Sequence, residues 1–109
     1  MTPGPFPPNF DINELRSAVT KVLSAVEAQH GERVSINEDF YRVAPVDQAF
    51  DVLGPDPVWT MGSLVDDVDS MRYFNDQDED EPVSIWHELA HLVGILRALE
   101  LVDLARING

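Results

Sequence analysis

Two histidines and a glutamate near the C-terminus have types and spacing that would suit metal chemistry. They stand in the run His87-Glu88-Leu89-Ala90-His91. Residues four apart lie on one face of a helix, so the two imidazoles could hold one Zn²⁺. The glutamate beside the first histidine could then activate a metal-bound water as a general base. The chemistry of such a site would be hydrolysis.

The residues that follow extend this pattern and then depart from it. Gly94 follows His91 by three positions, so residues 87–94 resemble the start of the metzincin signature of zinc peptidases. That resemblance implies a third histidine ligand three residues after the glycine. This chain has Arg97 there, a cation that cannot serve as the ligand. The residues after Gly94 are strong helix formers, so we expect the helix to continue where that family bends.

The bulky apolar residues of this helix fall on one side of it. With Ile85 at 0° and 100° per residue, a stripe lies between about −40° and +100°. Its members are Ile85, Trp86, Leu89, Leu92, Val93, Leu96 and Leu99. His87 at about 200° and His91 at about 240° lie opposite the centre of the stripe, beside Gly94 and Ala98. We therefore expect the stripe to face the core and both histidines to lie on the other face.

This orientation favours an ordinary amphipathic helix over a metal site. Further along the helix, Glu100 and Asp103 point more than a right angle away from both histidines. A third ligand would have to come from another segment: Asp66, Asp67 or Glu79. We expect no catalytic residue and no cofactor. The alternative is a minimal zinc hydrolase with Zn²⁺ on His87 and His91 and with Glu88 as the base.

The charge of the chain is strongly negative and is concentrated in the middle third. The 109 residues carry 20 acidic and 7 basic side chains, a net charge of −13, which argues against a nucleic-acid binder. Residues 45–81 hold eleven acids and Arg72 alone, so −10 of this charge lies there. Such a region is either a solvated surface or a negative face for a basic protein partner. The residues predicted to bind that partner are Asp66, Asp67, Asp69, Asp76, Asp78, Glu79, Asp80 and Glu81.

Other features restrict the class of protein. The chain has no cysteine, which excludes a disulfide scaffold, thiolate zinc, an iron–sulfur cluster and a cysteine nucleophile. No apolar stretch reaches the roughly 20 residues of a membrane span, and no secretion signal begins the chain. We expect a soluble, cytoplasmic protein without a membrane partner.

The pattern of elements predicts an α+β fold. Apolar residues at three- and four-residue steps indicate helices, and short β-branched or aromatic runs indicate strands. We expect a small antiparallel sheet of two to three short strands, from Val34–Ile36, Phe40–Val43 and Val58–Met61, with a helical turn at 45–50. We expect three helices packed on this sheet, at about 11–30, 63–74 and 82–106. Residues 1–10 predict a flexible proline-rich arm, and residues 11–109 a single domain.

Several short runs are similar to a group of small acidic bacterial proteins of uncharacterised function. They are Asp39–Pro45, Phe50-Asp51, Gly62–Asp67 and Gly94–Leu99, within residues 38–100. The resemblance implies no activity. It implies that Ile95–Leu99 is a structural part of a helix, which agrees with an incidental role for the histidines.

The apolar arc of the last helix is wide, because Ala98, Leu101 and Val102 extend it around the helix. Large exposed apolar patches tend to be interfaces, so we expect a homodimer through the 82–106 helix. Our leading hypothesis is a non-enzymatic protein-binding or regulatory module.

Overall fold

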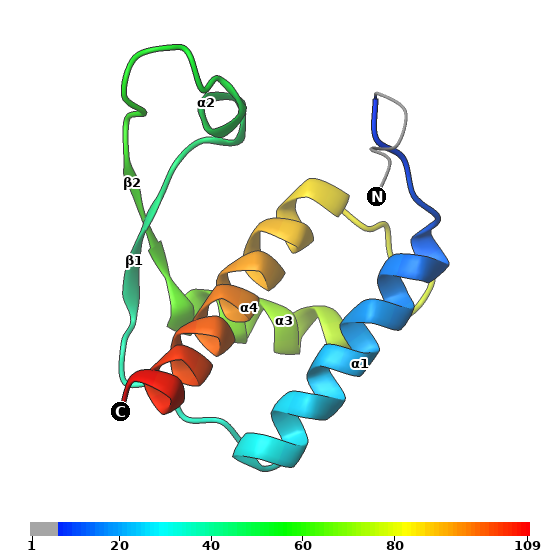
Figure 1. Ribbon diagram of the computed structural model, residues 1–109. Coiled ribbons are helices and arrows are strands. Elements are labelled where there is room, and N and C mark those ends of the chain that lie inside the picture. The colour runs from blue at the N-terminus through cyan, green and yellow to red at the C-terminus, as the bar shows by residue number, and fades with distance from the viewer. Residues whose placement is uncertain (1–6) are drawn as a thin grey trace. The chain divides into compact units, whose positions relative to one another are not determined.

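The computed structural model describes residues 7–109 (Figure 1), so most of the expected proline-rich arm lies outside the described residues. The contacts of the chain divide it after Ser35 into two compact units. Unit 1 contains helix α1 (Ile12–His30), and unit 2 begins at Ile36 and contains every other helix and strand of the described residues.

Helix α1 matches the helix expected at about 11–30. Asp11 caps its N-terminus, because its side chain accepts a hydrogen bond from the Asn13 amide at 2.7 Å. The helix ends at Gly31, whose φ of 90° is a conformation that glycine adopts without a Cβ penalty. The Gly31 amide donates to the Glu27 carbonyl at 2.8 Å, which closes the last turn.

Unit 2 begins with an antiparallel pair of strands, which confirms the expected α+β class. β1 (Phe40–Val43) pairs with β2 (Thr60–Ser63), with Phe40 opposite Ser63 and Val43 opposite Thr60. The short helix α2 (Val46–Phe50) lies in the connection between them, where we expected a helical turn.

The strand expected at Val34–Ile36 was a wrong prediction. These residues do not join the two-stranded sheet of the described chain, and they lie at the division between the two units. An alternating pattern becomes a strand only where a neighbouring strand pairs with its backbone, and here none does.

Helix α3 (Leu64–Asp76) follows β2 directly and is anchored at its start. The Ser63 hydroxyl accepts from the Asp66 amide at 3.3 Å, as expected for a helix cap. The Asp39 carboxylate accepts from the Val65 amide at 3.0 Å and from the Ser63 hydroxyl at 2.9 Å. These hydrogen bonds stabilise the ionised carboxylate and so lower the pKa of Asp39 below its usual value. The bond from the Val65 amide has the largest effect. The residue before β1 therefore joins the hairpin to α3.

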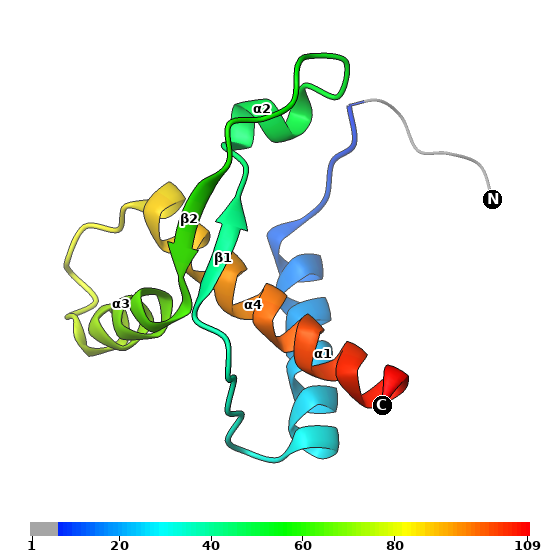
Figure 2. The ribbon, with the colours of Figure 1, turned by 90° about the vertical axis from the view of Figure 1, so that its left-hand side faces the viewer.

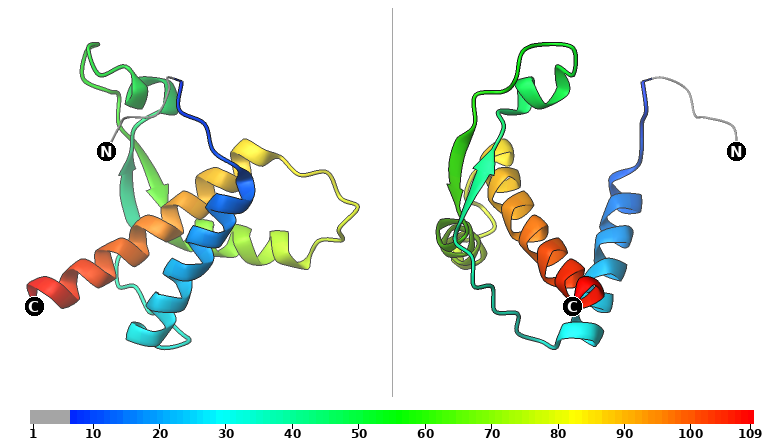
Figure 3. Two further views of the ribbon diagram at one scale, coloured as in Figure 1. Left: turned by 45° about the vertical axis from the view of Figure 1, so that its right-hand side comes forward. Right: turned by 60° about the vertical axis from the view of Figure 1, so that its left-hand side comes forward.

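Helix α4 (Ile85–Asn108) packs against α3 across the end of the hairpin (Figures 2 and 3). Within residues 7–109, Leu64 at the start of α3 is the sole buried apolar residue, so the core of unit 2 is small. None of the helices in this part of the chain is both long and apolar enough to cross a bilayer.

The face that α4 turns toward α3 is the opposite of the expected one. Gly94 is buried and His91 and Ala98 are half-buried, whereas Trp86 is 76% exposed and Leu89 is 54% exposed. The expectation that the bulky apolar stripe faces the core was therefore wrong. Helices approach closely where the contacting side chains are small, and the glycine face of α4 allows that approach.

Candidate functional site

Three elements of unit 2 bring one polar side chain each to a shared buried position. Tyr41 comes from β1, Asp67 from α3 and His91 from α4, and we call them the Tyr41–Asp67–His91 cluster. His91 Nδ1 lies 2.7 Å from Asp67 Oδ1. The Tyr41 hydroxyl donates to Asp67 Oδ2. Asp67 is 4% exposed, so a buried carboxylate has both of its oxygens engaged.

Two glycines make the space for this cluster. A Cβ at Gly94 would overlap the Asp67 carboxylate and the Tyr41 hydroxyl. A Cβ at Gly62, directly across the strand pair from Tyr41, would overlap the tyrosine ring. The two positions therefore need glycine because a polar side chain from another element or strand occupies the place of a Cβ.

The environment changes the acid–base properties of the tyrosine. Burial raises the pKa of Tyr41 to about 12, and the hydrogen bond to Asp67 and its negative charge add to the effect. Loss of the proton would place a phenolate against a carboxylate. When His91 is neutral and donates from Nδ1 to Asp67, its Nε2 is left as an acceptor. The cluster thus links three elements through one buried carboxylate.

The other members of the His-Glu-x-x-His run make fewer contacts. His87 is exposed, and its ring lies edge-on to His91 with centroids 4.7 Å apart. Trp86 lies edge-on to His87 at 5.6 Å. Glu88 is half-buried on the same helix. The structure brings the two histidines together, and His91 is the one that bonds to another element.

The ligand set does not fit a catalytic zinc ion. Helix α3 does cross the histidine face, but Asp67 binds His91 as a hydrogen-bond partner, through Nδ1. In metal sites, a carboxylate in this position orients a histidine ligand and does not itself bind the metal. Only the two imidazoles would then remain as ligands, whereas catalytic zinc uses three protein ligands. No group of three or more histidine, aspartate or glutamate side chains suited to a metal occurs within residues 7–109. We therefore derive no reaction step through zinc.

The remaining acids of α3 form an exposed row with a tyrosine. Asp66, Asp69, Tyr73 and Asp76 follow each other at steps of three and four, which places them on one face of the helix. All four are exposed, and Tyr73 is 70% exposed. Asp67 points the other way, into the cluster, and is not part of this row.

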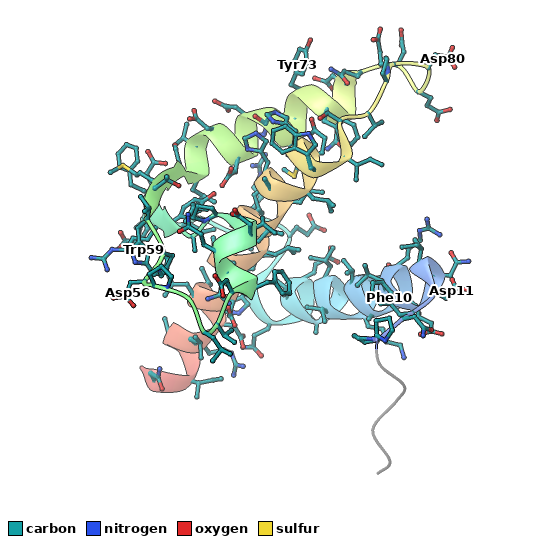
Figure 4. All side chains as sticks on the ribbon, turned by 90° about the horizontal axis from the view of Figure 1, so that it is seen from above. Phe10, Asp11, Asp56, Trp59, Tyr73 and Asp80 are labelled. Carbon is teal, nitrogen blue, oxygen red and sulfur yellow. The ribbon has the colours of Figure 1, made fainter. Side chains whose placement is uncertain are left out.

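The loop between α3 and α4 continues the negative charge. Asp78, Glu79, Asp80 and Glu81 are exposed, and Figure 4 shows Asp80 and Tyr73 at the same end of α3. None of these four acids forms an ion pair within residues 7–109, and neither do Asp66, Asp69 and Asp76 of the row. We call the row and the loop together the acidic surface; its members are Asp66, Asp69, Tyr73, Asp76, Asp78, Glu79, Asp80 and Glu81.

Sequence reasoning named Asp67 among the residues that could reach the histidines, but it missed the burial of Asp67 with Tyr41, although two signals pointed to it. Asp67 lies one turn after the buried Leu64, within the inward-facing positions of α3. Gly94 stands in the middle of a long helix that does not end there, which indicates close approach by another group. Tyr41 carried no such signal, because its role depends on pairing with Gly62 across the hairpin.

No family model matches this chain, and comparison with characterised proteins and with solved structures gives no match either. The site therefore has to be interpreted from its own residues.

Proposed function

We propose that this chain is a non-enzymatic protein-binding module that takes a basic protein partner on its acidic surface. The observation that carries the proposal is the exposed row Asp66–Asp69–Tyr73–Asp76, continued by the acids at 78–81. Seven carboxylates that form no ion pair within residues 7–109 create a negative field that attracts and orients a positively charged protein.

The tyrosine in the row gives this surface more than charge. Tyr73 is 70% exposed and is flanked along the helix face by Asp69 and Asp76. Exposed tyrosines are enriched among the residues that dominate binding energy, because a rigid ring buries a large area and its hydroxyl still finds a partner. We therefore assign Tyr73 as the anchor and the surrounding acids as the groups that guide the partner to it.

The test compares capture of proteins from the native cell extract by three forms of the chain. The wild type should retain a basic protein at about 50 mM salt and release it at about 500 mM, since salt screens exposed charges. Once that protein is identified, Tyr73→Ala should weaken its binding at least tenfold, about 1.4 kcal/mol. Asp66→Asn with Asp69→Asn should slow association and reduce the salt dependence.

The matched control removes the same charge elsewhere. Asp47→Asn with Asp51→Asn changes two exposed acids at α2 and should leave binding unchanged. The proposal fails if no protein is retained at low salt, or if the control pair weakens binding as much as the pair on α3.

A further inference from the structure

We infer that the apolar stripe of α4 is the contact between two copies of this chain. The stripe consists of the exposed residues on one side of the first half of the helix: Ile85, Trp86, Leu89, Leu92, Val93 and Leu96. It lies on the side of α4 away from the Gly94 face that packs on α3.

Unit 2 leaves this stripe uncovered. Ile85 is 68% exposed, Trp86 is 76% exposed and Val93 is 53% exposed. An aromatic side chain such as Trp86 buries about 150–250 Å² when fully covered, and an aliphatic one buries less. At 36% to 76% exposed, the six together offer roughly 600 Å² of apolar surface. A stable interface buries about 800 Å² on each partner, and the residues flanking the stripe supply the remainder. The area is therefore of the size that a dimer needs.

The charge pattern of α4 is compatible with contact between two copies. The stripe itself carries no charge. On the second half of the helix, Glu100 pairs with Arg97 at 2.8 Å and Asp103 pairs with Arg106 at 3.0 Å. Residues 82–109 hold three acids and two bases, a net charge of −1, so this helix itself adds little to the repulsion between two copies.

The order of the residues along the stripe also fits a two-fold contact. In an antiparallel crossing with the axis between Leu89 and Val93, Leu89 of one copy lies near Val93 of the other. Trp86 then lies near Leu96, so large and small apolar groups oppose each other on both sides of the axis. A single surface is in this way complementary to itself.

The experiment is sedimentation equilibrium on the full chain, with Leu89→Glu as the variant and Val65→Glu as its control. Leu89 and Val65 are 54% and 56% exposed, and Val65 lies on α3, outside the stripe. The wild type should be dimeric in the micromolar range. Leu89→Glu should weaken the dimer at least 100-fold, because a charge enters the interface twice. Val65→Glu adds the same charge and should leave the dimer intact.

Circular dichroism checks that both variants keep their helices. A wild-type chain that stays monomeric up to about 100 µM overturns the inference, since the dimer is expected to form in the micromolar range. The inference also fails if both variants weaken the dimer equally, or if the dimer persists in Leu89→Glu. The inference does not depend on the basic partner, and Leu89→Glu should leave capture through the acidic surface unchanged.

Discussion

Asp67 is buried because its two oxygens have two different partners. His91 and the Tyr41 hydroxyl replace the water that a carboxylate loses on burial. Removal of either partner would leave part of a buried charge uncompensated, which is costly. This one residue therefore holds β1, α3 and α4 to each other in a unit whose apolar core is small.

The raised pKa of Tyr41 gives a measurable signature of the cluster. The chain has two tyrosines, so Tyr73→Phe leaves Tyr41 alone, and its phenolate absorbance should titrate with a midpoint about pH 12. The folded state holds this proton more tightly than the unfolded state does, whose pKa is about 10. The contribution of the protonated Tyr41 to the free energy of unfolding is therefore complete below pH 10, and it should be lost as the pH rises from 10 through 12.

Asp67→Asn in the same Tyr73→Phe background serves as the comparison. An amide carries no negative charge beside the phenolate, so the midpoint should move part of the way down toward 10, and the effect of burial should remain. A midpoint near 10 in the folded Tyr73→Phe protein would show that Tyr41 does not contact a buried carboxylate.

At the scale of the element, α4 uses its two sides for different contacts. The side with His91, Gly94 and Ala98 is small or polar and packs on α3. The side with Trp86 and Leu89 is bulky and apolar, and unit 2 does not cover it. Close approach and a buried polar contact place the first side inward, which leaves the second for a partner.

Gly94→Ala tests whether α4 packs on α3 through its glycine face, because the change in the free energy of unfolding has opposite signs with and without that contact. Alanine favours a helix interior over glycine by about 1 kcal/mol, so an uncontacted position would gain stability. Here the new Cβ meets the Asp67 carboxylate and the Tyr41 hydroxyl, which hold each other in place. We expect a net loss of about 2 kcal/mol in the free energy of unfolding, measured by urea denaturation.

The control for Gly94→Ala is Ala90→Gly, one turn earlier on α4 and exposed. It should lose about 1 kcal/mol through helix propensity alone. If Gly94→Ala instead stabilises the protein, α4 does not approach α3 through this face.

At the scale of the whole molecule, the chain consists of two units joined by an irregular segment. Gly31–Asp39 lies between α1 and β1, and the division falls after Ser35. Such connections open locally more readily than helices do, which exposes their backbone to proteases.

Limited trypsin digestion should therefore cut first after Arg33, an exposed residue in this segment. Mass spectrometry would show a fragment of residues 34–109 that retains α3 and α4. Arg16 and Lys21 lie within α1 and are exposed too, so they are the internal controls. First cleavage at either of them would contradict a division into two units at this segment.

Much of the local structure was predictable from short stretches of sequence. Asp11 and Ser63 are residue types that favour the N-cap position and they cap their helices, and Phe40–Val43 forms the expected strand. Caps and periodicity depend on residues a few positions apart, so they can be identified without the fold. The Val34–Ile36 pattern failed because a strand also needs a distant partner.

The sequence by itself determined where the three long helices lie, to within about three residues at their ends, and the concentration of charge in residues 45–81, because each depends on neighbours along the chain. Only the tertiary structure decided which face of α4 packs inward, and that Asp67 is buried while Asp66 and Asp69 stay exposed. The physical reason is that the groups around the Asp67 carboxylate come from two other elements: the hydroxyl of Tyr41 from β1, and the imidazole of His91 and the space above Gly94 from α4. A carboxylate is stable in the interior only when all three are present together.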